Sequence, residues 1–220
     1  LGRIAVHLDG DAMVLDAAGV GPLPLPAEPS GAPDRSVHVW DDEVAAVDAG
    51  DAAAAWLAQV LGDGHRLVGM SDASHRPVEP GYARDGEEVS FADGYPFLLA
   101  NVASLAEVER RAGVTLAMER FRPNLVIEGA PPFAEDDWSQ VRIGAVRFRV
   151  VKPCVRCVLT TLDPDSGEAG REPLRTLATF RRAPGGGVTF GQNLLAVDTG
   201  RVRVGDEVVA EPPTTTAGAR

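Results

Sequence analysis

The stretch "VRIGAVRFRVVKPCVRCVLTTLDPDSG", residues 141–167, holds both cysteines of the chain between two runs that are rich in β-branched residues. Residues 141–151 and 157–162 are typical of β-strands, because β-branched side chains pack well on a pleated surface and turn residues bound the runs. Further runs of this kind cover residues 2–8, 12–17, 36–44, 65–70, 124–129, 187–197 and 201–210. So many short strands predict a barrel or a sandwich.

Three helices are expected among these strands. They cover residues 51–61, residues 104–112 with Ser104 as the cap and Glu107 at the capping-box position, and residues 172–181 with Pro173 in the first turn. The predicted class is therefore α+β and dominated by β-structure. Residues 22–34 are rich in proline and predict a loop, and residues 211–220 predict a disordered tail.

Composition limits the possible functions. The chain has 220 residues, of which 45% are hydrophobic, and a net charge of −11, which argues against a nucleic-acid partner because duplex binding depends on neutralising phosphates. No apolar run approaches the length of a membrane span and no secretory leader is visible, so a cytoplasmic location is predicted. Because the chain begins inside a strand and without Met, an N-terminal portion is expected to be missing.

The two cysteines leave several interpretations open when they are taken alone. A structural zinc site needs four ligands, and the four histidines of the chain are scattered. A thioredoxin-like dithiol requires a strand-to-helix turn, whereas Cys154 and Cys157 are expected to lie between two strands. Buried cysteines that act as small hydrophobic residues are the most common alternative.

A second candidate segment is "RFRPNLVIEG", residues 120–129, in which Arg122 and Asn124 flank a proline. An arginine fork suits a phosphate group, and an amide suits the edge of a heterocycle. Taken singly, Arg122 is more commonly a surface ion-pair partner and Asn124 a turn residue.

The order of the segments "SFADGYPFLLANVASL", "RFRPNLVIEGAPPFAEDDW", "RIGAVRFRVVKPCVRCVLTTLDPDSG", "PLRTLATFRR", "FGQNL" and "VRVGDEV" resembles the MOSC-domain proteins of the bacterial YcbX type, relatives of the mitochondrial amidoxime-reducing component. The resemblance covers residues 89–209, with a weaker match of residues 1–70 to the N-terminal β-barrel region of the family. It implies a partial N-terminal β region at 1–70 and a MOSC domain with a barrel-like core at 71–210.

The resemblance also implies a molybdenum cofactor, the molybdenum–molybdopterin complex, with Cys157 as the metal ligand and catalytic residue. By the same comparison Arg122, Asn124, Arg156 and Asp93 match cofactor-binding positions, whereas Cys154 is not a ligand. The implied reaction is the reduction and detoxification of N-hydroxylated compounds such as hydroxylamines, amidoximes and N-hydroxylated nucleobases. A cofactor carrier without catalytic activity, and sulfur transfer through a persulfide on Cys157, remain as alternatives.

The chain lacks two segments that the family normally has, and it is expected to need an external electron donor. The basic "PVKS"-like and "GDR"-like segments of the family do not occur in this chain. Two cysteines cannot hold an iron–sulfur cluster, and no GxGxxG motif follows a strand, so a separate flavoprotein or ferredoxin-type electron donor is expected. Pyridoxal phosphate is not expected as a cofactor.

Two further groups of residues are interpreted structurally. The acidic run at residues 134–137 predicts a solvated face, and the three dispersed tryptophans predict core positions.

Overall fold

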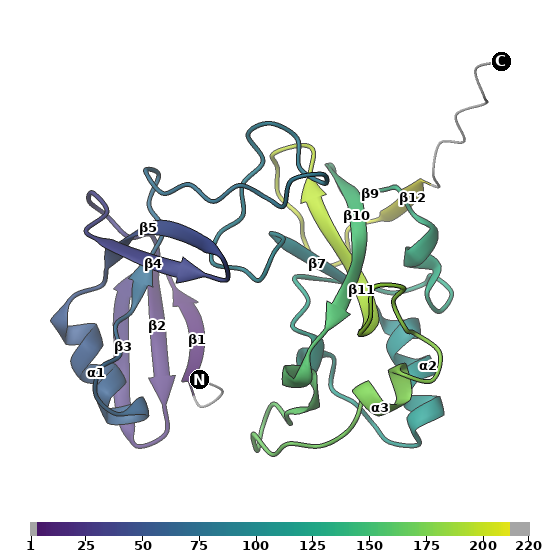
Figure 1. The fold of residues 1–220 in the computed structure, drawn as a ribbon, viewed down its shortest axis with the longest axis horizontal. Coiled ribbons are helices and arrows are strands. Elements are labelled where there is room, and N and C mark those ends of the chain that lie inside the picture. Colours follow the sequence, from purple (N-terminus) through teal and green to yellow (C-terminus); the bar gives the residue numbers. More distant parts are fainter. Residues whose placement is uncertain (1–3, 212–220) are drawn as a thin grey trace. The chain divides into compact units, whose positions relative to one another are not determined.

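The structure, a computed structural model, describes residues 4–211, and the chain divides into two compact units, Leu1–Gly94 and Tyr95–Arg220. Figure 1 shows the elements of each unit. Residues 2 and 3 of the first expected strand and residues 212–220 of the expected tail lie outside the described range. The domain boundary between residues 70 and 71 stays a prediction.

The first unit contains two small antiparallel sheets and one helix. Strands β1 (Ile4–Asp9), β2 (Ala12–Ala17) and β3 (Val20–Pro26) form one sheet, and β4 (Arg35–Val39), β5 (Asp42–Asp48) and β6 (Val68–Gly69) form the other. Helix α1 (Asp51–Leu61) has the predicted bounds, and it packs against β3. Its buried residues Trp56 and Leu57 form a small core with Leu15, and the Trp56 Nε1–H donates to the Gly21 carbonyl at 2.6 Å.

The Pro-rich segment was expected to be a loop, but its first part forms strand β3. The prolines at positions 22, 24 and 26 are spaced by two, so their nitrogen atoms face the same side of the strand. Because β3 pairs only with β2, it needs hydrogen-bond donors on one side alone. The loop prediction was therefore wrong for residues 22–26.

The run at 36–44 was expected to be one strand, but it contains a tight hairpin between β4 and β5. Trp40 occupies the turn with a left-handed backbone, φ 56°, and is 75% exposed. The core prediction for Trp40 was therefore wrong, because a side chain at a hairpin turn points away from the sheet it connects.

The second unit is built on one six-stranded sheet with the order β12-β9-β10-β11-β7-β8. The strands are β7 (Phe97–Asn101), β8 (Leu125–Ile127), β9 (Gln140–Ile143), β10 (Val146–Arg156), β11 (Val188–Ala196) and β12 (Val208–Glu211). All pairings are antiparallel except β7 with β8. The β-dominated α+β class and the barrel-like sheet implied by the resemblance are confirmed. In the run at 201–210, however, only the last residues form a strand.

Short helices cover this sheet and connect its strands. They are α2 (Val102–Ala112), α3 (Leu174–Leu177) and the 3-10 turns η1 (Met118–Phe121), η2 (Ala134–Asp137) and η3 (Val158–Thr161). Helix α2 begins two residues before the predicted cap, because the Asn101 side chain accepts a hydrogen bond from the Ala103 N–H. The predicted capping box at Ser104 was therefore wrong. Helix α3 forms only the centre of the predicted 172–181 helix.

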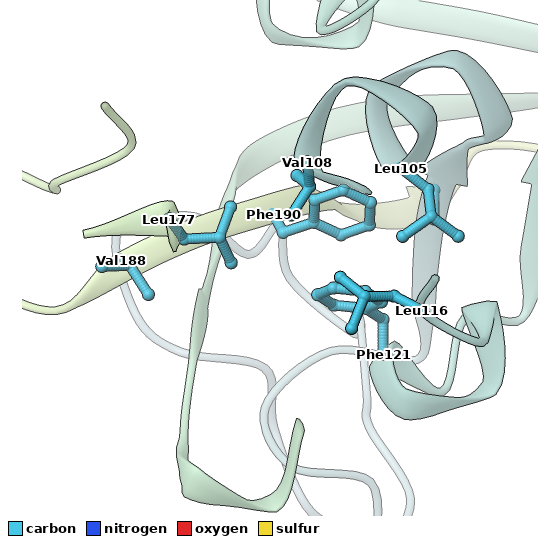
Figure 2. Packing of buried hydrophobic residues seen from close by; sticks show 8 residues of the cluster. Leu105, Val108, Leu116, Phe121, Leu177, Val188 and Phe190 are labelled. Carbon is cyan, nitrogen blue, oxygen red and sulfur yellow. The ribbon is translucent and has the colours of Figure 1, made fainter. Parts of the chain in front are cut away.

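Two hydrophobic clusters form the core of this unit, and the first of them holds α2 and α3 to the sheet. In the first, shown in Figure 2, the Phe121 and Phe190 rings stack with centroids 4.0 Å apart, and Leu105 and Val108 of α2 belong to the same cluster. The second lies around Leu99, Val141, Phe148 and Leu194, with Trp138 at its margin. Phe121 therefore anchors η1, and with it the "RFRPN" segment, in the core of the second unit.

Two further predictions were wrong in this unit, the second of them in part. Residues 157–162 were expected to be a strand, but most of them form η3. The run at 134–137 was expected to be solvated, which holds for the exposed Asp136 and Asp137 but not for Glu135. The Glu135 side chain is fully buried and accepts hydrogen bonds from Ser104 and Asn101. None of the helices in residues 4–211 is long and apolar enough to cross a membrane.

Candidate functional site

The two cysteines lie at the end of β10, where the ladder with β11 is irregular. The pairing shifts between Pro153 and Val155, so Phe190 and Gly191 of β11 oppose Cys154 alone. A bulge of this kind bends the sheet and changes the direction of side chains. Along β10 the exposure alternates, with Cys154 partly buried and Cys157 exposed.

This extended geometry separates the two thiols. Cα atoms three residues apart in an extended chain lie about 10 Å apart. A disulfide needs Cα atoms within about 7 Å, so Cys154 and Cys157 cannot bridge unless the strand unfolds locally. No group of three or more His, Cys, Asp or Glu side chains in residues 4–211 is placed to hold a metal ion. The dithiol and zinc interpretations therefore gain no support.

Cys157 is held by the turn that follows it. It is the N-cap residue of η3 with an extended backbone, and its carbonyl accepts hydrogen bonds from the Thr160 N–H at 3.2 Å and the Thr160 hydroxyl at 3.0 Å. Thr160 and Thr161 are buried. The exposed thiol therefore projects from a backbone that its own neighbours fix.

Arg156 connects this segment to η1. Its Nη2 donates to the Phe121 carbonyl at 2.7 Å, and its Nη1 donates to the Cys154 sulfur at 2.8 Å. The guanidinium carbon also lies 5.6 Å from the centre of the Phe121 ring. The Nε is buried and has no hydrogen-bond partner within the described part of the chain.

Arg122 follows directly on η1 and is exposed. Its backbone is left-handed, with φ 52° and ψ 48°, which costs a non-glycine residue about 1–3 kcal/mol. Together with Met118, Glu119, Pro123 and Val126, Arg122 lines an open depression of about 240 Å³. No side chain in the described range forms an ion pair with it, so the guanidinium is available to a ligand.

Asn124 has a structural role in the same segment. Its Oδ1 accepts a hydrogen bond from the Leu98 N–H at 2.8 Å, and its own N–H donates to the Leu98 carbonyl at 3.0 Å. These bonds extend the parallel pairing of β7 with β8 by one step. The Nδ2 group of Asn124 is the donor that this pairing leaves for a ligand.

Asp93 belongs to the first unit, whereas the other four predicted site residues belong to the second. Its Oδ1 accepts a hydrogen bond from the Trp40 indole at 2.9 Å. Its carbonyl accepts one at 3.2 Å from Arg76, a buried arginine that also binds the Ser90 and Ala92 carbonyls. The position of Asp93 is thus fixed within its own unit.

Arg120 was not identified from the sequence. Its Nη1 donates to the Leu162 carbonyl at 2.7 Å and its Nη2 to the Asp163 carboxylate at 2.6 Å, just after η3. Hydrogen bonds from the Ser166 backbone and side chain, helped by Arg120, hold the pKa of Asp163 below its usual range. No local pattern in the sequence indicates this contact, because the partners are more than 40 residues apart in the chain.

Comparison with known proteins gives two family matches, and the C-terminal one begins inside the first compact unit, before Asp93. Residues 86–209 match the MOSC domain, and residues 1–64 match the MOSC N-terminal beta barrel domain. All four candidate residues of the second unit lie within the first of these matches.

Curated relatives match most of the chain. The human mitochondrial amidoxime-reducing component 1 is 35% identical over 93% of the chain and 65% of its own length. The rat mitochondrial amidoxime reducing component 2 is 32% identical over 93% of the chain and 65% of its own length. The Xenopus laevis component 1 is 35% identical over 85% of the chain and 58% of its own length. The chain therefore spans less than two thirds of the length of these relatives.

Proposed function

This chain belongs to the MOSC-domain family, and we propose that it binds a molybdenum cofactor through the Cys157 thiolate and reduces N-hydroxylated compounds. The observation that carries the proposal is the exposed Cys157 thiol, which follows directly on β10 and is fixed as the N-cap residue of η3. The names of the relatives, amidoxime-reducing components, support the reaction class.

The donor set around Cys157 fits such a group. A thiolate is a soft ligand of the kind that binds heavier transition metals, and guanidinium groups suit a phosphate. Arg156 holds a buried Nε without an acceptor in the described range, one residue before the proposed ligand. Arg122 presents a guanidinium that forms no ion pair within residues 4–211, beside an open depression. These are donors that the protein itself does not use.

Each residue then has a distinct task. Cys157 holds the metal, Arg122 binds the cofactor phosphate through its planar fork, and the Asn124 Nδ2 donates to the heterocycle. Arg156 fixes the backbone that carries Cys157, with its Nε left for the cofactor. Asp93 stays a predicted cofactor-binding residue, and within its own unit its Oδ1 accepts from the Trp40 indole. When bound, the cofactor would supply a redox-active metal for the reduction of the N–OH group.

The reaction requires electrons from outside the chain. We propose a flavoprotein or ferredoxin-type donor, because the two cysteines cannot hold an iron–sulfur cluster. The substrates are small hydroxylamines, amidoximes or N-hydroxylated nucleobases, whose removal would be a detoxification. The cytoplasmic location stays a prediction, since the relatives above are named as mitochondrial proteins.

The test compares Cys157→Ala with Cys154→Ser. In the second variant the serine hydroxyl keeps an acceptor for the Arg156 guanidinium. Molybdenum and pterin per chain are measured by elemental analysis and fluorescence, and benzamidoxime reduction is measured with reduced viologen. We expect wild type and Cys154→Ser to contain molybdenum and turn over, and Cys157→Ala to lose activity and most of its molybdenum.

Other outcomes would contradict the proposal. Equal loss of molybdenum in both variants would indicate that both thiols bind the metal. Molybdenum without turnover in wild type would indicate a cofactor carrier. A persulfide on Cys157 without molybdenum would indicate sulfur transfer.

A further inference from the structure

Two arginines cross between the segment that carries Arg122 and the segment that carries Cys157. Arg156, from the end of β10, donates to the Phe121 carbonyl in η1. Arg120, from η1, donates to the Leu162 carbonyl and the Asp163 carboxylate just after η3. The segment from residue 156 to residue 163 is thus attached to η1 at both of its ends.

We infer that Arg120 is a positioning residue, which holds the Cys157 segment in place against the Arg122 segment. The inference rests on the proposed function, because it concerns the relative placement of the proposed metal ligand and the proposed phosphate ligand. Arg120 itself has no part in the proposed cofactor contacts.

The contact is built to be rigid. The Arg120 side chain is only 13% exposed, so water competes weakly for its hydrogen bonds. Its acceptor is fixed as well, because the Asp163 Oδ1 accepts from the Ser166 N–H at 2.9 Å, the Ser166 hydroxyl at 3.0 Å and the Asp165 N–H at 3.2 Å. Arg120 therefore connects η1 to the turn at Asp163, which its own hydrogen bonds already hold in place.

The consequence concerns cofactor binding more than folding. Phe121 is held in the core by its stacking on Phe190, so η1 keeps its place without Arg120. The Cys157 segment has less support, since Val158 and Leu159 are 67% and 59% exposed. Loss of Arg120 would therefore release the end of η3 first. A thiol on a more flexible segment binds a cofactor with lower affinity, because ordering the segment on binding costs free energy.

The test uses the full chain with Arg120→Met, which keeps the apolar stem, and Arg120→Lys, which keeps the charge but reaches only one of the two acceptors. Asp163→Asn weakens the same contact from the other side, in case the arginine variants fold poorly. Arg147→Met is the control. Arg147 lies on the same strand, β10, but ten residues before Cys157, and it forms an ion pair with Asp198.

Three quantities are measured for each variant: molybdenum per folded chain, the rate of Cys157 alkylation relative to Cys154 by mass spectrometry, and the melting temperature. We expect a several-fold loss of molybdenum and faster relative alkylation of Cys157 in Arg120→Met, with an intermediate effect in Arg120→Lys and Asp163→Asn. Arg147→Met should match wild type in the first two quantities.

The outcomes separate the two proposals. A lower melting temperature with unchanged molybdenum and unchanged alkylation would make Arg120 purely structural and overturn the inference alone. Absence of molybdenum from wild type would overturn the proposed function and this inference with it.

Discussion

The buried Glu135 side chain is predicted to be one of the largest single contributors to the stability of the second unit. Its Oε1 accepts a hydrogen bond from the Ser104 hydroxyl at 2.6 Å, and its Oε2 accepts one from the Asn101 Nδ2 at 3.0 Å. Asn101 and Ser104 lie at the start of α2, so this carboxylate ties the η2 turn to the first turn of the helix.

The expected loss of unfolding free energy follows from the hydrogen-bond donors that a substitution at Glu135 leaves without acceptors. Glu135→Ala leaves the Ser104 O–H without an acceptor, although the Ser104 oxygen still accepts from the Phe133 N–H at 2.7 Å. It also removes one acceptor from Asn101, which still donates to the Pro131 carbonyl at 2.9 Å. Each unsatisfied buried group costs about 1–3 kcal/mol, and the lost packing adds to this, so we expect a destabilisation of about 3–5 kcal/mol. Glu135→Gln keeps one acceptor but sets an amide donor against Asn101, so we expect about 1–3 kcal/mol.

Urea unfolding followed by circular dichroism measures the free energy of unfolding of each variant. Asp137→Asn is the control, because it removes a charge from an exposed side chain of the same acidic run and should change stability by less than about 0.5 kcal/mol. If Glu135→Ala stays as close to wild type as this control does, the buried network has no energetic role and the reasoning fails.

Two further predictions concern other parts of the second unit. Gly191→Ala should lower the free energy of unfolding by about 2–4 kcal/mol in the same assay. The reason is that Gly191 has φ 78° and an added Cβ would lie 2.6 Å from the Leu99 carbonyl oxygen. Gly185→Ala is the control and should be nearly neutral, because a Cβ added there has no atom within 4 Å. Hydrogen bonds from Arg110 and Arg111 lower the pKa of Glu107 to about 2 from its ordinary 4.5. The ionised Glu107 carboxylate therefore stabilises the folded state fully above pH 4.5, and this stabilisation is lost as the pH falls toward 2. The difference in melting temperature between wild type and Glu107→Gln should shrink over that interval. A difference that does not depend on pH would contradict this.

The sequence predicted the elements whose pattern is local. The alternation in β10 and β11 and the composition of α1 identified these elements without knowledge of their partners. The prediction failed where a local hydrogen bond competes with β-propensity. The run after Cys157 is rich in β-branched residues, but the Thr160 hydroxyl and N–H both bind the Cys157 carbonyl and close a 3-10 turn.

The buried polar residues could not be predicted, since their partners are far away in the chain. Glu135 is 31 residues from Ser104, and Arg120 is 43 residues from Asp163. Charged residues are mostly exposed, so an acidic run is assigned to the surface unless its partners are known. The proposed site residues were selected by the order of motifs along the chain, and nothing in periodicity or composition distinguishes Arg122 or Arg156 from other arginines.

The spacing of the cysteines shows how the same motif changes its meaning with the backbone that carries it. On a helical turn, thiols three residues apart meet, and a redox pair or a shared metal results. On the extended end of β10, Cys154 lies against the Arg156 guanidinium, and Cys157, just after the strand, is exposed. One thiol thereby becomes an acceptor that helps to orient an arginine, while the other stays available to a ligand. The strand therefore makes the two cysteines inequivalent, and this inequivalence is why substitutions at the two positions are predicted to have different effects on cofactor content.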